Sequence, residues 1–554
     1  MTSKSFDELN EAMLLRVLEI NPDAATICGR HDPYDKHLPH GGVKRIEDNV
    51  ALLADWMARA QGIAEAETLS RDQTVSLQVL EMTHESYRFA TEDFPVWKMW
   101  PNAFEGPGSA MLLMLIRDYA PFEERIDSMA HRLGEMPRYL KQFRERYNGI
   151  QTPRVWTESA VEGCKGFPLF LDMVEKQAGD KVSPEVMGRL RASSSDVRSA
   201  LEEHLPWIER MLADSTDSFA MGRDKYEKLL RIKGIKYTAD ELLAIAEKSL
   251  KEMKAEIAQV AKRISNGGTV HDALRIVESD SPASTEEVVD VTRRETEKAK
   301  RYLMEHDVVT VPERSEVHVL RTPDFLENDV PTAMTFLPAY FDERQDSVYL
   351  VSHQGTKENL GAVWNHAAIV NTVVHEAFPG HHLQGVMSNT KPWMHQLPHI
   401  MYTSEALYPP YESQEGWAHY CELMMHGKGF CGTDKDEFAM LHFGIWRACR
   451  VFHDVKLASD EASVEEMIQW FMKEANSIRD PVEADVKGFC RSPGYGMSYL
   501  IGRYLVLELK KELKVALGKE FSEKKFHDLV AQNGNLPFCL LEKEVKHGMG
   551  LDGS

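Results

Sequence analysis

The sequence predicts a mainly α-helical protein that carries one small β-sheet. The first 300 residues show mostly helical patterns, and from about residue 358 the chain returns to helix and continues so to its end. Between these parts, short segments rich in β-branched and aromatic residues alternate polar and apolar positions, which is the period of a strand. We therefore expect a sheet at about 315–353 between two helical regions.

A long helix that begins at Thr238 is the clearest single element. Thr238 and Glu241 form a capping box, in which the hydroxyl and the carboxylate each satisfy a backbone N–H at the helix start. Apolar residues then follow at alternating steps of three and four, so that they share one helical face: Leu243, Ala246, Leu250, Met253, Ile257, Val260 and Ile264. The run 265–268 ends this helix. A second capping box at 284–287 predicts another helix, which ends at about Glu305.

The composition is that of an acidic globular protein. Of its 554 residues, 87 are acidic and 65 are basic, so the formal net charge is −22. This charge argues against binding to nucleic acids or to anionic membranes, because both are negatively charged and attract basic protein surfaces. No apolar run approaches the ~20 residues that span a bilayer, and Asp7, Glu8 and Glu11 interrupt any secretory signal. The seven cysteines include no C-x-x-C pair, which is typical of reduced thiols, so we expect a cytoplasmic protein.

One segment, which reads HEAFPGHHLQ, has the residue types of a zinc site. His375 and Glu376 begin it as in the H-E-x-x-H helix of zinc hydrolases, where two histidines one turn apart bind one ion and the glutamate acts as base. Here the fourth position after His375 is Pro379, which cannot bind a metal and interrupts a helix. A bend that absorbs two extra residues would bring His381 to the ligand position. His382 would reach it only if the bend absorbed three extra residues. We therefore favour His381 as the second ligand and His382 as a residue that supports the site or contacts substrate.

A third ligand is predicted on the helix that follows. After a Pro-Pro pair, Ser413 is a candidate N-cap, which places Glu415 in the first helical turn. Glu415, His419 and Glu422 then share one helical face. We predict that Glu415 completes a zinc site with the two histidines. His419 and Glu422 either form hydrogen bonds that support the ligands or belong to an ordinary charged surface.

Together, HEAFPGHHLQ and EGWAHYCE resemble a bacterial family called domain of unknown function number 885, which is grouped with gluzincin-type zinc metallopeptidases. The opening segment at 22–39 and the stretch PGYGMSYLIG near the end support this resemblance. The resemblance implies that zinc is bound by His375, by His381 or His382, and by Glu415.

The resemblance also implies roles for residues that do not bind the metal. Glu376 would be the general base, and Tyr499 would stabilise the oxyanion of the reaction unless it is an ordinary core tyrosine. The sequence departs from the family pattern at Tyr495, where the family has Gln. The basic residue upstream of this stretch is Lys487 or Arg491. Binding of a peptide's terminal carboxylate by Arg491 would give carboxypeptidase-like specificity.

These features predict a large helical, zincin-like metallopeptidase fold. We expect one integrated unit with a helical N-terminal half at 1–310 and a catalytic half at 311–554. The predicted function is zinc-dependent hydrolysis of short peptides, with Zn²⁺ as cofactor and with neither nucleic acid nor membrane as partner. The alternatives are a zinc hydrolase of other amides and a binding protein without activity, and the presence of Glu376 speaks against the second. The sequence does not indicate an oligomeric state.

Overall fold

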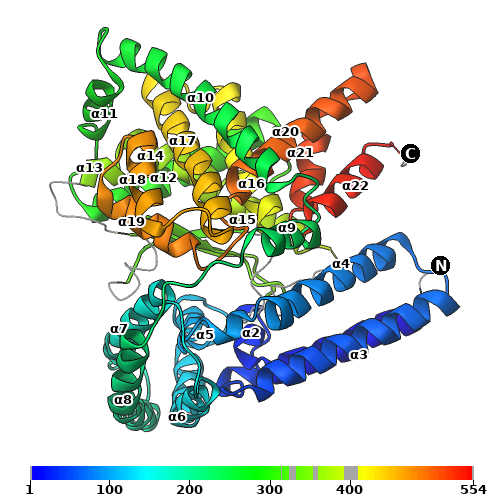
Figure 1. The fold of residues 1–554 in the computed structure, drawn as a ribbon, viewed down its shortest axis with the longest axis vertical. Helices are drawn as coiled ribbons and strands as arrows, with labels where there is room; N and C mark the ends of the chain where they lie inside the picture. Colours follow the sequence, from blue (N-terminus) through cyan, green and yellow to red (C-terminus); the bar gives the residue numbers. More distant parts are fainter. Residues whose placement is uncertain (1–2, 314, 324–331, 353–359, 392–409, 552–554) are drawn as a thin grey trace. The chain divides into compact units, whose positions relative to one another are not determined.

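The computed structural model describes residues 3–313, 315–323, 332–352, 360–391 and 410–551. Over these residues the chain is mainly α-helical with one small three-stranded sheet, as predicted (Figure 1). Its internal contacts divide it into two compact units. Unit 1 holds the described residues of 1–219 together with 339–343, and unit 2 holds the other described residues from 220 onward. The division into functional halves at residue 310 stays a prediction.

Unit 1 is built mostly from long helices. Its α-helices are α1 (Lys4–Ile20), α2 (Pro22–Ile27), α3 (Lys44–Ala66), α4 (Arg71–Arg88), α5 (Glu105–Ile116), α6 (Phe122–Arg146), α7 (Arg154–Ala178) and α8 (Pro184–Ala213). Short 3-10 or π turns lie at Tyr34–Lys36, Phe89–Asp93 and Val96–Lys98. Helix α1 packs on α3, and α8 packs on both α6 and α7. A buried cluster that includes Phe6, Trp56 and Tyr87 joins α1, α3 and α4.

Unit 2 contains the sheet and most of the helices. Before the sheet lie α9 (Arg223–Ile232), α10 (Ala239–Ile264), α11 (Val270–Glu278) and α12 (Thr285–His306). After it lie α13 (Leu360–Val363), α14 (His366–Glu376), α15 (His381–Ser388), α16 (Tyr411–Lys428), α17 (Asp434–Ala458), α18 (Val464–Ala475), α19 (Arg479–Phe489), α20 (Ser498–Leu517), a 3-10 turn (Gly518–Glu520), α21 (Glu523–Gln532) and α22 (Phe538–Gly548). None of the described helices combines the length and the apolarity that crossing a membrane requires.

The two helices predicted from capping boxes are confirmed. The hydroxyl of Thr238 accepts a hydrogen bond from the backbone N–H of Glu241 at the start of α10. The apolar stripe of α10 faces the core, except that Leu242 is buried at its first turn and Leu243 is only partly buried. Helix α12 begins after its cap at Ser284 and ends within one residue of the predicted end.

The predicted sheet is also confirmed, with strands β1 (Val317–Arg321), β2 (Ala333–Phe336) and β3 (Ser347–Val351). Strand β3 lies in the centre, parallel to β1 and antiparallel to β2, so that Tyr349 pairs with both Val319 and Thr335. All of β3 is buried, as expected for a strand that is covered on both faces. After Phe336 the chain leaves the sheet, shortly before Pro338, which cannot donate a ladder hydrogen bond. Helix α14 packs against β2 and α12 against β1.

Two glycines let helices α16 and α20 cross at backbone contact. A Cβ atom on Gly416 would lie 2.4 Å from the Cα atom of Gly502. A Cβ atom on Gly502 would lie 2.1 Å from the carbonyl oxygen of Glu412. These distances are far below van der Waals contact, so any larger residue would force the two helices apart. The crossing sets the first turn of α20 beside the first turn of α16.

We expect Gly502→Ala to lower the free energy of unfolding by about 1–3 kcal/mol, because its Cβ atom meets backbone that cannot turn aside. The midpoint of urea unfolding, followed by circular dichroism, measures this change. Gly427→Ala is the matched control, since Gly427 lies on α16 and a Cβ atom added there would meet no atom within 4 Å. Equal stability of Gly502→Ala and Gly427→Ala would show that the helices tolerate separation and would contradict the proposed constraint.

Candidate metal centre

The chain reverses sharply between α14 and α15. Helix α14 ends at Glu376 and α15 begins at His381, with a cis peptide bond between Phe378 and Pro379. Gly380 packs directly on the end of α14, since a Cβ atom there would lie 1.7 Å from the carbonyl oxygen of His375. Only glycine, which lacks a Cβ atom, fits this contact. The bend that the sequence predicted therefore exists and ends one helix before starting the next.

Trp417 of α16 supports this reversal. Its indole Nε1 donates a hydrogen bond of 2.8 Å to the carbonyl oxygen of Pro379, and the side chain is fully buried. Because Trp417 lies two residues after Glu415 on the same helix, the bond ties the loop to the element that carries the third predicted ligand. The EGWAHYCE motif thus contains both a candidate ligand and a residue that positions the other two candidate ligands.

Three side chains converge behind this loop: His375, His381 and Glu415. The Nε2 atoms of His375 and His381 lie 3.3 Å and 3.2 Å from the Oε2 atom of Glu415. The two imidazole rings stand nearly perpendicular, at 88°, with centroids 4.8 Å apart. One ligand atom from each residue lies within 4.8 Å of the other two. This arrangement offers two nitrogens and one oxygen to a single cation.

The Oε2 atom of Glu415 provides a test of whether a cation fits here. It is buried, and it has no hydrogen bond of acceptable geometry within the described part of the chain. A buried carboxylate oxygen without a donor is costly unless a metal or a proton satisfies it. Two imidazoles and one carboxylate are a ligand set of catalytic zinc sites that leave a fourth position open. The residues present therefore fit a zinc ion.

The structure distinguishes the two adjacent histidines. His381 joins the group of three, whereas His382 is fully buried, with its Nδ1 atom 2.7 Å from the hydroxyl of Ser347. Its ring packs edge-on against Phe378. Burial lowers the pKa of His382 to about 3, so His382 is neutral. It packs behind the three candidate ligands. Contact between His382 and a substrate stays a prediction.

Glu422 holds His375 from the side opposite to Glu415. Its Oε1 atom lies 2.7 Å from Nδ1 of His375 and 2.8 Å from Nη2 of Arg447, and its Oε2 atom accepts a hydrogen bond from Asn371. A neutral His375 that donates from Nδ1 presents the lone pair of Nε2 toward the metal position. Glu422 therefore has the contacts of a residue that orients a ligand.

The charges at this site shift one another's pKa values. Burial by itself lowers the pKa of His375, but the close carboxylates of Glu415 and Glu422 outweigh burial and raise it to about 9. Burial by itself raises the pKa of Glu415, but His381 and His375 outweigh burial and hold it well below its usual range. The carboxylate of Glu415 is therefore ionised at neutral pH, as a metal ligand must be.

Two tyrosines approach Glu415 from the segment at the start of α20. The hydroxyl of Tyr495 donates a hydrogen bond of 3.0 Å to Oε1 of Glu415, and the hydroxyl of Tyr499 lies 3.4 Å from that of Tyr495. The ring of Tyr499 also stacks on that of His375, with centroids 6.2 Å apart. Tyr495, which departs from the pattern expected from the family resemblance, thus supplies a donor to a candidate ligand. The role of Tyr499 as an oxyanion donor stays a prediction.

Glu376 lies at the end of α14 beside the three candidate ligands and is 9% exposed. Its carboxylate has no hydrogen bond or ion pair among the described residues. Burial first, and then the charge of Glu376, raise the pKa of the Tyr349 phenol. Arg491 lies just after α19, where its Nε atom hydrogen-bonds to the carbonyl oxygen of Gly488 at 3.4 Å. His419 contacts the carbonyl oxygen of Tyr499 and the guanidinium of Arg503. Within the described residues it has no hydrogen bond to the candidate ligands. Contact between Arg491 and a substrate stays a prediction.

Three residues with direct contacts in or beside the site were not predicted as site residues: Tyr495, Arg447 and Arg450. Both arginines lie on α17, a helix without any recognisable motif. The one available signal was Tyr495 itself, because an unexpected residue in an otherwise matching motif marks a position with a changed contact.

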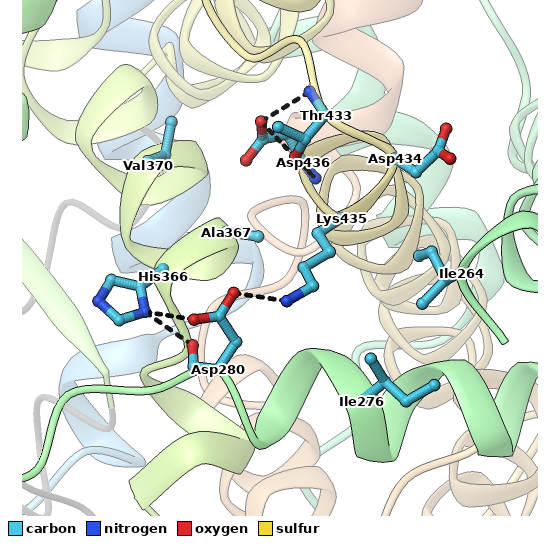
Figure 2. A pocket seen from close by; sticks show the side chains of 10 residues that line it. All are labelled: Ile264, Ile276, Asp280, His366, Ala367, Val370, Thr433, Asp434, Lys435 and Asp436. Atoms are coloured by element: carbon cyan, nitrogen blue, oxygen red, sulfur yellow. Dashed lines mark hydrogen bonds and ion pairs between the residues drawn. The ribbon is translucent and has the colours of Figure 1, made fainter.

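A separate pocket of about 510 Å³ lies at the opposite end of α14 (Figure 2). Asp280 is held there between Nδ1 of His366, at 3.0 Å, and Nζ of Lys435, at 2.6 Å, as Figure 2 shows. Apolar side chains that line the same pocket include Ile264, Ile276 and Val370. None of the candidate metal ligands lines this pocket.

Comparison with known proteins extends these observations. Residues 22–545 match the model of the family described as "Bacterial protein of unknown function (DUF885)". The fold is similar to "The crystal structure of the putative lipoprotein from Colwellia psychrerythraea", with a TM-score of 0.83 and 18% identity over 99% of this chain and 100% of that one. It is also similar to "The structure of a putative lipoprotein of unknown function from Shewanella oneidensis", with a TM-score of 0.75 and 20% identity over 98% and 99% of the two chains. A search of the curated proteins finds no match.

We expect Glu422→Gln to weaken zinc binding about 10- to 100-fold, because the variant loses the charge that orients His375 and raises its basicity. Competition with a chromophoric chelator at one fixed pH measures this affinity. Glu437→Gln is the control, since Glu437 forms an ion pair with Arg263 on the same unit and has no contact with the three candidate ligands. Zinc affinity that is unchanged in Glu422→Gln would contradict the orienting role.

Proposed function

The chain belongs to the bacterial DUF885 family, whose members are described as proteins of unknown function, and from that premise we propose that it is a zinc-dependent peptidase acting on short peptides. The observation that carries this proposal is the convergence of His375, His381 and Glu415, with Glu376 next to His375 in the chain at the end of α14. The three side chains would hold the metal, and the carboxylate of Glu376 would do the proton chemistry.

Zinc in such a site supplies a Lewis acid that polarises a carbonyl group and lowers the pKa of water toward ~7. Glu376 would accept the proton of the attacking water and later deliver it to the leaving amine. Tyr499 would donate from its phenol to the developing oxyanion. Tyr495 and Glu422 keep Glu415 and His375 in position through the hydrogen bonds described above.

The order of elements supports the same proposal. A small sheet precedes α14, α14 carries His375 and Glu376 at its end, and α16 carries Glu415 in its first turns. Zinc hydrolases with an H-E-x-x-H helix use this order of a helix with two histidines and a later ligand. We therefore also propose a zincin-like catalytic half, in which the reversal at Gly380 replaces the single helical turn between the histidines. Short peptides as substrates and a cytoplasmic location stay predictions.

We expect Glu376→Gln to keep its zinc and to lose activity about 10²- to 10⁴-fold in kcat, because glutamine cannot accept the water proton. Digestion of a peptide library by the zinc-loaded protein, read by mass spectrometry, first identifies a substrate, and kcat then compares wild type with the variant. Removal of zinc by a chelator and its return provide the control. Zinc binding without cleavage of any peptide by wild type would refute the peptidase function, and full activity of Glu376→Gln would refute the role of Glu376 alone.

A further inference from the structure

Arg450 of α17 lies beside the candidate metal centre, and the proposed chemistry does not use it. Its guanidinium carbon lies 4.6 Å from the ring centroid of Tyr499 and 4.6 Å from that of Phe489. The ring of His375 lies 6.2 Å from the same Tyr499 ring. Tyr499 therefore contacts both this cation and a candidate zinc ligand.

The guanidinium of Arg450 is fixed along one edge only. Its Nε and Nη2 atoms both donate to Oδ2 of Asp485, at 2.9 Å and 2.6 Å. Asp485 is itself held by a hydrogen bond from Nε1 of Trp446 and by Nε2 of His453, at 3.2 Å. Asp485 thus binds the Nε side of the guanidinium, and Nη1 makes no bond to it. Within the described residues Nη1 has no hydrogen-bond partner, and 18% of the Arg450 side chain is exposed.

The neighbouring arginine differs in this respect. Arg447 lies one turn earlier on α17, is only 9% exposed along its side chain, and pairs with the buried Glu422 through Nη2. Its Nε and Nη1 atoms also have no hydrogen-bond partner within the described residues, but they are buried, so the two arginines differ in exposure. Arg447 therefore serves the ligand network, whereas Arg450 keeps an accessible pair of donors. A planar fork of two N–H groups matches the two oxygens of a carboxylate.

We propose that Arg450 binds the C-terminal carboxylate of the peptide substrate, which makes the enzyme a peptidase that acts near the C-terminus. This inference rests on the proposed function. The spacings of 6.2 Å from His375 to Tyr499 and 4.6 Å from Tyr499 to Arg450 are each shorter than two extended residues of ~3.3 Å. A carboxylate on Arg450 therefore lies within about three residues of a carbonyl group at the metal centre. The rings of Tyr499 and Phe489 stand nearly perpendicular, at 86°, and each lies 4.6 Å from the guanidinium carbon of Arg450, so they hold that group from two sides.

Three matched peptides that share one cleavable bond test this inference on the zinc-loaded, full-length protein. The first has a free C-terminal carboxylate, the second ends in an amide, and the third ends in an aspartyl amide that offers only a side-chain carboxylate. We expect wild type to cleave the free acid with a kcat/KM about 10- to 100-fold above that of the amide. Charge-assisted hydrogen bonds to the carboxylate give a ratio of this size. We expect the aspartyl amide to behave like the plain amide, because its carboxylate is displaced from the chain end.

Variants then assign the preference to one residue. We expect Arg450→Met to lose the preference by slowing cleavage of the acid while leaving cleavage of the amide and the zinc content nearly unchanged. Arg450→Lys keeps the charge without the fork and should retain part of the preference. Arg479→Met is the matched control, because Arg479 lies on α19 in surface ion pairs with Glu465 and Glu483 and should keep the full preference.

The possible failures are distinguishable. If wild type cleaves the acid and the amide equally well, the inference is wrong and the peptidase function stands, and this result does not depend on whether any variant folds. Faster cleavage of the aspartyl amide than of the free acid would assign the site to side-chain carboxylates and also overturn the inference. Loss of the preference in Arg491→Met, with the preference kept in Arg450→Met, would move the carboxylate contact to Arg491. If wild type cleaves no peptide, the proposed function falls and this inference falls with it.

Discussion

The candidate site depends on backbone contacts that only glycine allows. Gly380 lies on the carbonyl oxygen of His375, so the chain reverses at once and returns His381 to the ring of His375. Gly416 and Gly502 let α16 and α20 touch, and this contact places the start of α20 against Glu415. A spacing of six residues between the histidines therefore serves the same end as the usual four. The difference is that the geometry rests on a tight loop and a helix crossing instead of on one regular helical turn.

Buried carboxylates are the main charged groups of the candidate site. Glu415 and Glu422 are buried on opposite sides of His375, and each would be costly without a compensating charge. Glu422 has its cation in Arg447, and Glu415 has its hydroxyl donor in Tyr495, but the Oε2 atom of Glu415 has only the two imidazoles. A divalent cation at this point would compensate the charge and complete the coordination of all three groups. The same logic explains why an acidic protein keeps a few of its carboxylates away from water.

The sequence predicted what depends on local patterns. Capping boxes located α10 and α12, alternation located the sheet, and Pro379 predicted the bend that brings in His381. The prediction of the α10 stripe was wrong by one residue at its start, where Leu242 is buried in place of Leu243. The residue that the first turn buries depends on the neighbouring helix. Arg447 and Arg450 were not predicted, since their contacts join α17 to α14, α16, α19 and α20, and no local pattern reports such distant packing. Tyr495 was noticed only as a departure, and its bond to Glu415 needed the helix crossing to be known.

The most direct test of the account is a crystal structure of the zinc-loaded full-length protein with anomalous data collected at the zinc edge. The account predicts one strong anomalous peak at ~2.0–2.1 Å from the Nε2 atoms of His375 and His381 and at ~2.0–2.2 Å from a carboxylate oxygen of Glu415. A peak bound by His382 in place of His381, or a zinc ion that does not touch Glu415, would contradict it.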